Sequence, residues 1–274
     1  SVQHAVDVAG EGDVIKVAAG TYAGVFTQAA PSGYMGGTSI TQTVLISGKN
    51  NLTIRGGYTP SDWDTFNPDA NRTILDANSD GRVLVIFNAS TITVEGFIMT
   101  QGYSNGQGGS SPSMEPGGAV YQYNATATLQ YNVIQNSSAR GGGGVYMKNS
   151  PGTLARNLIQ DNFSVSSVSG GHGGGIYLDN SNAHVDENTI IRNSADLYGG
   201  GIYTNDNSSY YRNKLANNSA KIGGGFYGEA NSFLFKNGTV ISNTASESGG
   251  GFYLIGAAAS IYYSTIEDNQ AAVN

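Results

Sequence analysis

A tyrosine that follows a glycine-rich block recurs along the second half of the chain, and this repeat constrains the fold more than any other feature. The block reads GGGIY, GGGVY or GGGFY in most copies. Its tyrosines are Tyr121, Tyr146, Tyr177, Tyr203, Tyr227 and Tyr253, at spacings of 25, 31, 26, 24 and 26 residues. A second landmark, an asparagine shortly after an aliphatic residue, falls at Asn136, Asn162, Asn193, Asn218, Asn243 and Asn269, at spacings of 26, 31, 25, 25 and 26. The shared period indicates a repeat of about 25 residues with one insertion, between Asn162 and Tyr177.

The composition of the repeat decides its type. The chain has 40 glycines in 274 residues, and each repeat holds short alternating runs such as IYLDN among many Asn, Ser and Thr. Such runs favour strands, whereas the glycines disfavour helices. Helical repeats are therefore excluded, and the LxxLxLxxN signature of leucine-rich repeats is absent. Three short strands with their turns fill about 25 residues, so the sequence predicts an all-β fold: one right-handed parallel β-helix domain with three strands per coil.

Alternation along each strand assigns side chains to the inside or the outside of the coil. The three predicted inward columns are Val120, Val145, Ile176, Ile202, Phe226 and Phe252; Leu129, Leu154, Val185, Tyr210, Phe235 and Ile261; and Ile134, Ile159, Ile190, Leu215, Val240 and Ile266. Turn positions between the second and third strands hold Asn132, Asn157, Asn188 and Asn213, then Gly238 and Ser264. We expect these asparagines to adopt left-handed backbone angles and to hydrogen-bond one another from coil to coil.

The repeats resemble a known group of proteins. GGGIY, GGGVY and GGGFY followed by I-x-x-N or V-x-x-N are similar to the GGAI and FxxN repeats of the polymorphic outer membrane protein family, within the pectate-lyase-like superfamily of right-handed β-helices. An aliphatic residue replaces that family's Phe. The opening SVQHAVDVAGEGDVIKVAAGTYAG also resembles the start of such helices. The resemblance implies a short capping helix from about Val2 to Val8, and it leaves the function open because the superfamily holds lyases, hydrolases and adhesins.

The domain therefore divides into an N-terminal cap over residues 1–12, early irregular coils with long loops over 13–116, and regular repeats over 117–274. Four long segments interrupt the coils: QAAPSGYMGGTSI, GYTPSDWDTFNPDAN, QGYSNGQGGSSPSMEPGG and FSVSSVSGGHGG. Insertions at the turns of a solenoid usually gather on one side, where they form a contact region.

Charge and composition narrow the partners. The formal net charge is −7, and the 13 Lys and Arg residues are scattered singly, so we expect no nucleic acid partner. The chain has no cysteine, which excludes a thiolate metal site and a cysteine nucleophile. No apolar stretch is long enough for a membrane span in this segment, and no targeting signal is visible.

The charged residues do not form an evident catalytic constellation, and we predict no catalytic residue, no metal site and no cofactor. In register, Arg156, Glu187 and Arg212 share one column, and Asp161 and Arg192 share another, so we expect exposed ion pairs. Asp186 and Glu187 point to opposite sides unless a turn intervenes. We expect His172, in the inserted FSVSSVSGGHGG, and His184, on a second strand, to be solvated surface residues.

Two features are candidate binding sites. If the register is correct, Tyr121, Tyr146, Tyr177, Tyr203, Tyr227 and Tyr253 form an outward stripe of rings about 4.8 Å apart. Such a stripe either shields the backbone or contacts a sugar or protein, because tyrosine offers rigid amphipathic area. The only tryptophan, Trp63, lies in an inserted loop with Asp62, Asp64 and Asp69. That loop either binds a cation or a sugar or packs Trp63 against the outside of the helix.

The sequence therefore predicts an extracellular or cell-surface module, structural or adhesive and non-catalytic. Its expected partners are a cell-surface glycan or protein, or further copies of itself. The alternative is a polysaccharide lyase or hydrolase with its site in the inserted loops.

Overall fold

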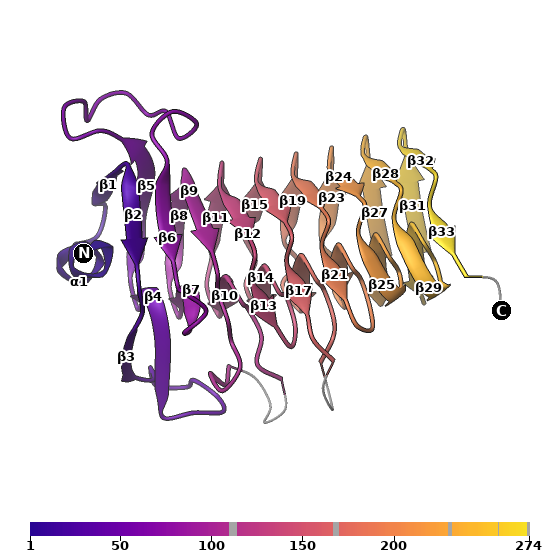
Figure 1. Ribbon diagram of the computed structural model, residues 1–274, viewed down its shortest axis with the longest axis horizontal. Coiled ribbons are helices and arrows are strands. Elements are labelled where there is room, and N and C mark those ends of the chain that lie inside the picture. Colours follow the sequence, from indigo (N-terminus) through magenta and orange to yellow (C-terminus); the bar gives the residue numbers. More distant parts are fainter. Residues whose placement is uncertain (110–113, 167–169, 230–231, 257, 273–274) are drawn as a thin grey trace.

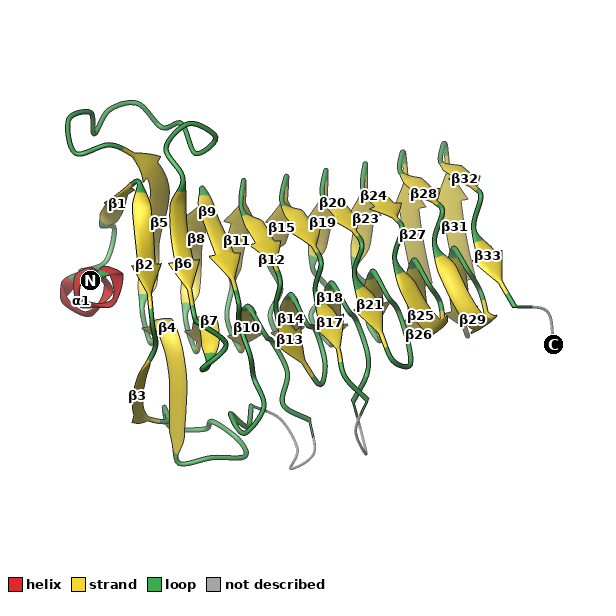
Figure 2. Ribbon diagram, in the orientation of Figure 1, coloured by secondary structure: helices red, strands yellow, loops and turns green. Residues whose placement is uncertain are grey.

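The computed structural model describes residues 1–109, 114–166, 170–229, 232–256 and 258–272. The chain winds into coils that stack along one long axis, with helix α1 (Val2–Val8) at one end and the C-terminal strands at the other (Figure 1). Strands make up far more of the described residues than helix α1 does, as the glycine-rich alternating repeats predict (Figure 2). The expected fold class is confirmed.

Each coil contributes one strand to each of three nine-stranded sheets. The tyrosine sheet contains β3 (Phe26–Ala29), β4 (Ser39–Ser47), β7 (Arg82–Phe87), β10 (Val120–Tyr123), β14 (Val145–Lys148), β18 (Ile176–Asp179), β22 (Ile202–Thr204), β26 (Phe226–Glu229) and β30 (Phe252–Ile255). The second sheet contains β1 (Val14–Ala18), β5 (Asn50–Tyr58), β8 (Ser90–Glu95), β11 (Ala127–Gln130), β15 (Thr153–Ala155), β19 (His184–Asp186), β23 (Ser209–Tyr211), β27 (Ser232–Lys236) and β31 (Ala258–Tyr262). The third sheet contains β2 (Gly20–Ala23), β6 (Thr73–Asp76), β9 (Phe97–Thr100), β12 (Val133–Gln135), β16 (Leu158–Gln160), β20 (Thr189–Ile191), β24 (Lys214–Ala216), β28 (Thr239–Ile241) and β32 (Thr265–Glu267).

A fourth, shorter sheet adds to the three strands per coil that the sequence predicts. It contains β13 (Ser138–Ala139), β17 (Phe163–Ser164), β21 (Ser194–Ala195), β25 (Ser219–Ile222), β29 (Thr244–Ser248) and β33 (Gln270–Ala271). Its strands lie between the third sheet and the glycine block, where two-residue pieces such as Ser194–Ala195 carry no readable alternation. Pairing with the neighbouring coils therefore creates these strands, because isolated pieces of this length cannot form a ladder alone.

The three predicted inward columns form the core. In the five coils from Val120 to Val240, every predicted core residue is fully buried. The last coil differs: Phe252 is partly buried, whereas Ile261 and Ile266 are 37% and 48% exposed. At the opposite end, α1 buries Val2 and Val6 against the same core, so the expected capping helix is present with its predicted bounds.

Two ladders of buried asparagine amides run along the coils. In the first, Asn157 Oδ1 accepts from the backbone N–H and the Nδ2 group of Asn132, and Asn188 repeats this contact to Asn157. The second ladder consists of Asn162, Asn193, Asn218, Asn243 and Asn269. Each side-chain amide thus forms hydrogen bonds with backbone groups at a buried turn.

One detail of the predicted ladder was wrong. The asparagines do not adopt left-handed angles; the preceding residue does, as at Tyr131, Arg156 and Glu187, with φ near +54°. In the second ladder, which the sequence did not predict, the recurring asparagine is displaced by one position in the first repeat. Ser137 occupies the place of Asn162 and accepts the N–H of Gly102, because Asn136 lies in the preceding turn.

Candidate functional site

The six tyrosines form one column in register, but they are not an exposed stripe. Their ring centroids are 4.6 to 5.8 Å apart, close to the predicted spacing. The first five, from Tyr121 to Tyr227, are at most 5% exposed, and Tyr253 is partly buried. The expected exposure was therefore wrong, and these five rings present no contact surface to a ligand.

Side chains from two insertions and from the short segments before β22 and β26 cover the column and make it a second hydrophobic core outside the coil. Tyr34, Met114, Tyr198 and Ile222 pack against the tyrosines from the segments that precede the tyrosine-sheet strands. The insertions do not all gather on one side, as was expected: the loop that carries Trp63 lies at the opposite edge (Figure 1), whereas the insertions that supply Tyr34 and Met114 lie over the column and help to bury it. Parts of two insertions, residues 110–113 and 167–169, lie outside the described residues.

A buried arginine holds two of these segments in place. Arg82 is fully buried, and its Nη2 donates to the carbonyl oxygens of Gly108 at 2.6 Å and Pro116 at 3.0 Å. Its Nη1 donates to the Tyr34 hydroxyl at 2.8 Å, and the guanidinium lies 4.8 Å from the Tyr121 ring centroid. Backbone and hydroxyl oxygens thus accept hydrogen bonds from the Arg82 guanidinium. These contacts connect both covering loops to the tyrosine sheet.

A row of polar side chains lies beside the tyrosine column, two residues further along each strand. Asp179 accepts from Lys148 Nζ at 2.8 Å, from the Tyr146 hydroxyl at 2.8 Å and from Asn205 Nδ2 at 3.0 Å. Burial alone would raise the pKa of Asp179, but these hydrogen bonds together hold that pKa below its ordinary value. Glu229 continues the row two strands away and accepts from Tyr227 at 2.8 Å.

His172 is part of the covering layer, so the expectation of a solvated surface histidine was wrong there. Its ring lies 5.0 Å from Tyr198 and 4.9 Å from Tyr203 between centroids, and Nδ1 is buried without a hydrogen-bond partner. Burial lowers the pKa of His172, although the negative charge of Glu229 acts to raise it. His184, in contrast, is exposed and contacts Ser209, as predicted.

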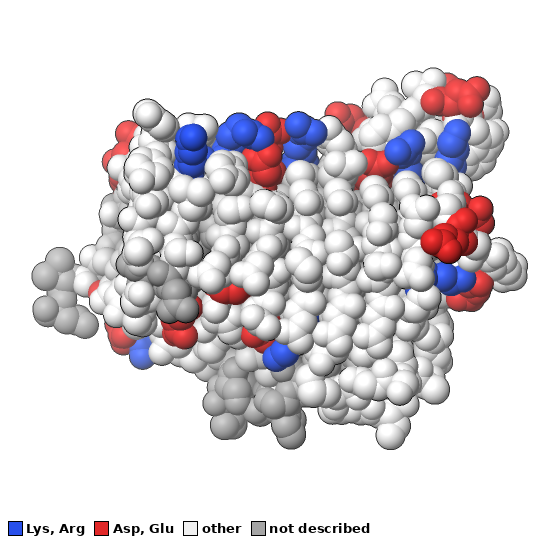
Figure 3. Space-filling model, turned by 180° about the vertical axis from the view of Figure 1, so that it is seen from behind, with Lys and Arg blue, Asp and Glu red and all other residues white. Residues whose placement is uncertain are grey.

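The predicted ion pairs form. Arg156 Nε lies 2.5 Å from Glu187, Arg212 Nε lies 2.8 Å from Glu187, and Arg192 pairs with Asp161 at 2.8 Å. The turn at Glu187 also brings Asp186 to the same arginine, so the two adjacent carboxylates share Arg212 and do not point to opposite sides. Figure 3 shows basic and acidic side chains gathered along one long edge of the molecule. Within the described ranges, no group of three or more His, Asp or Glu residues is placed to hold a metal ion.

Trp63 packs against the outside of the β-helix, which is one of the two roles expected for its loop. It is 42% exposed and stacks on Tyr58 at 6.1 Å between centroids, with Lys16 bonded to its carbonyl oxygen. The three aspartates do not converge on one ion: Asp62 is used within the loop, where it accepts the N–H groups of Asp64 and Thr65.

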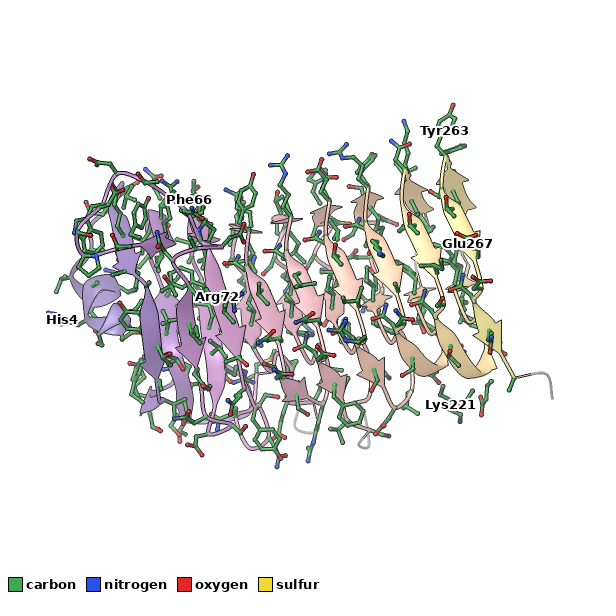
Figure 4. The ribbon with its side chains drawn as sticks, turned by 45° about the horizontal axis from the view of Figure 1, so that its top comes forward. His4, Phe66, Arg72, Lys221, Tyr263 and Glu267 are labelled. Atoms are coloured by element: carbon green, nitrogen blue, oxygen red, sulfur yellow. The ribbon has the colours of Figure 1, made fainter. Side chains whose placement is uncertain are left out.

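The other end of the same loop forms the wall of a groove on the outer face of the third sheet. The groove has a volume of about 300 Å³, and its lining includes Pro68, Asp69 and Arg72 from the loop. The floor consists of Ile98, Val133 and Leu158, which are paired neighbours on β9, β12 and β16. Figure 4 shows Arg72 and Phe66 on the N-terminal coils, far from Tyr263 on the last coil.

The remaining lining is amphipathic. Tyr131 is 41% exposed at the left-handed turn, where its ring packs on Phe66 and its hydroxyl accepts from Arg156 at 2.8 Å. Gln135 and Gln160 lie beside the floor, and Gln160 Nε2 donates to Gln135 Oε1 at 2.9 Å. The amide nitrogen of Gln135, the Asp69 carboxylate and the Arg72 guanidinium therefore border an aliphatic floor with one exposed aromatic ring.

The sequence did not predict this groove. The signal that could have revealed it is the outward aliphatic series Ile98, Val133 and Leu158. These residues alternate with the inward residues of the same strands, and only the inward columns were considered. The loop residue expected to bind, Trp63, belongs to a different surface from the loop residues that line the groove.

A comparison of the sequence with protein-family models identifies a right handed beta helix region over residues 71–271. No curated protein and no solved structure matches the chain significantly. No helix within the described ranges is both long and apolar enough to cross a membrane. The family match concerns the β-helix alone, so the similarity to polymorphic outer membrane protein repeats and to pectate lyases stays a resemblance. From its repeats, its parallel sheets and this match over most of its length, the chain belongs to the right-handed β-helix family.

Proposed function

We propose that the chain is a rigid, non-catalytic β-helix module that contacts a carbohydrate polymer, outside the cell or on its surface. The observation that carries this proposal is the groove on the third sheet. Sugar rings have apolar C–H faces and hydroxyl edges. The groove offers the aliphatic floor and the Tyr131 ring to the faces, and Asp69 and Arg72 to the edges.

Rigidity supports the same role. The two asparagine ladders and the tyrosine layer fix the register of successive coils, so the groove is formed without a ligand. A preformed site loses less conformational entropy on binding than a mobile one. The module therefore acts as a stiff carrier for one contact surface.

The test compares Tyr131→Ala with Tyr263→Ala on a panel of immobilised and soluble glycans. Both tyrosines occupy the same left-handed turn column, with φ of 54° and 50°, but Tyr263 lies on the last coil and does not line the groove. Loss of about 50 Å² of ring contact at about 25 cal/mol/Å² corresponds to about 1.3 kcal/mol, or roughly tenfold in Kd. We expect this loss for Tyr131→Ala alone; equal effects of the two variants, or no glycan binding by the unmodified chain, contradict the proposal.

Self-association through the third sheet is a competing outcome. Sedimentation equilibrium over a range of protein concentrations separates it from glycan contact. A dimer that Tyr131→Ala disrupts, in the absence of any glycan binding, assigns the groove to a second copy of the chain.

One observation favours a polysaccharide-active enzyme as the second candidate. Asp179 and Glu229 lie in one outward row, two strand spacings or about 10 Å apart by backbone geometry. This backbone spacing is slightly longer than the roughly 6.5–9.5 Å between the two carboxyl groups of an inverting glycosidase, a gap that side-chain rotation can close. Release of reducing or unsaturated sugar from polysaccharides, lost in Asp179→Asn, would establish the enzyme; the non-catalytic proposal expects no product with or without calcium.

A further inference from the structure

The groove continues into an apolar strip that crosses most of the third sheet. From β9 to β16, the outward aliphatic residue stands at the second position of β9 and at the first positions of β12 and β16. At β20 that position becomes Thr189, and the outward apolar residue moves two positions along the strand to Ile191, paired with Gln160. The strip consists of Ile98, Val133, Leu158, Ile191, Ala216 and Ile241.

The strip is partly accessible to solvent. Five of its side chains are only partly buried, and Ala216 is buried. The outward apolar residues thus form two straight runs, one side chain wide on each strand, that are offset by two strand positions at the paired Gln160 and Ile191. Six strands at about 4.8 Å spacing give the strip a length of about 24 Å, which is far longer than one sugar ring.

Polar groups border this strip on both sides. One border is the turn column that includes Tyr131, Arg156 and Glu187, and the other is the turn with the Arg192–Asp161 pair. The charges of these borders are largely paired, and the groove itself holds one cation, Arg72, and one anion, Asp69. A strip of this profile matches a long, narrow, uncharged molecule with apolar faces and hydrogen-bonding edges along its whole length.

We propose that the strip extends the groove into a series of subsites, and that the ligand is a linear, neutral glycan of several units lying along the helix axis. This inference rests on the proposed function and specifies its ligand. A protein partner fits less well, because a stable protein interface needs a broad patch of roughly 800 Å² on each partner, whereas the strip is one side chain wide. Short sugars occupy the groove only, and longer ones also cover Ile191 and Ile241.

The experiment measures affinity by calorimetry for neutral β-linked oligosaccharides of two to eight units, from the glucan, xylan and chitin series. In the unmodified chain we expect Kd to fall at least tenfold between the disaccharide and the hexasaccharide. Ile241→Lys and Ile191→Lys should each raise Kd for the hexasaccharide about tenfold and leave Kd for the disaccharide unchanged. Ile255→Lys is the matched control, because Ile255 is 46% exposed but lies on the tyrosine sheet.

The outcomes separate the two proposals. Equal affinity for short and long oligosaccharides, or equal losses in Ile241→Lys and Ile255→Lys, overturns the extended strip but keeps the groove. Absence of binding for every length overturns both proposals. A preference for acidic oligosaccharides of the same length overturns the assignment of a neutral ligand, and thermal unfolding of each variant shows that the fold is retained.

Discussion

Replacing one amide in the first asparagine ladder should destabilise the coil far more than its single side chain suggests. Asn188 is 1% exposed, and its Oδ1 accepts from the N–H and Nδ2 of Asn157 at 3.0 Å each. Its Nδ2 donates to the carbonyl oxygen of Leu154 at 2.8 Å and to Asn213 Oδ1 at 3.1 Å. Asn188→Ala removes all of these hydrogen bonds at once.

The magnitude follows from the groups left without partners. The Asn157 N–H and the Leu154 carbonyl lose their hydrogen bonds to the Asn188 side chain in a buried turn, and an unsatisfied buried group costs about 1–3 kcal/mol. Partial relaxation of the turn lowers the sum, so we expect a loss of about 3–5 kcal/mol in the free energy of unfolding. Asn188→Ser should lose about half as much, because Ser137 already fills the equivalent place in the second ladder.

Urea unfolding followed by circular dichroism, together with amide hydrogen exchange of the Asn157 N–H, measures the effect. The matched control is Asn217→Gly, because Asn217 is exposed, has φ of 55° and lies outside both ladders. We expect less than about 0.5 kcal/mol for that exposed position. If Asn188→Ala and Asn217→Gly shift the urea midpoint equally, the ladder does not stabilise the coil and the reasoning fails.

Three further predictions concern other parts of the fold. Arg82→Met should speed amide exchange in residues 103–109 and 114–117 and cost about 2–4 kcal/mol, because buried carbonyl oxygens lose their donor; unchanged exchange there contradicts the proposed tie. Gly174→Ala should reduce the unfolding free energy by at least about 2 kcal/mol, because a Cβ would lie 2.3 Å from the Ser194 carbonyl oxygen, whereas Gly10→Ala, whose nearest neighbour is at 3.7 Å, should be near neutral in the same denaturation assay. The folded pKa of Asp179 lies below its unfolded value, so its stabilising contribution is present above about pH 4 and is lost as the pH falls through the folded pKa. Unfolding midpoints measured from pH 6 to pH 2 should therefore fall less steeply in Asp179→Asn, and parallel curves would argue against it.

The fold could be predicted from the repeat because residues one period apart in the sequence become direct neighbours on adjacent coils. Val145, Ile176 and Ile202 recur one period apart, and the structure pairs them directly on β14, β18 and β22. Inward columns follow from alternation within a strand, which is a local property. The ion pairs of Arg156 and Arg192 were predictable for the same reason, since they join equivalent positions of adjacent coils.

The burial of the tyrosines could not be predicted in this way. Alternation placed Tyr177 and Tyr203 outside the coil, and they are outside it, but alternation says nothing about what covers an outer face. Among the covering side chains, Tyr198 and Ile222 are paired equivalents on adjacent coils, whereas Tyr34 and Met114 come from insertions without periodicity. Their positions depend on contacts such as that of Arg82 with Gly108, between residues 26 positions apart.

The sequence alone determined the β-helix, the three core columns and the coil-to-coil ion pairs, because a fixed period and alternation need only local geometry to become neighbours in space. Tertiary structure decided which outer face is buried and which is open. The inserted segments close over the tyrosine sheet, whereas the loop ending at Arg72 borders the third sheet and leaves its aliphatic strip accessible. That difference arises from how aperiodic loops pack on a periodic surface, which is a global property that no single repeat encodes.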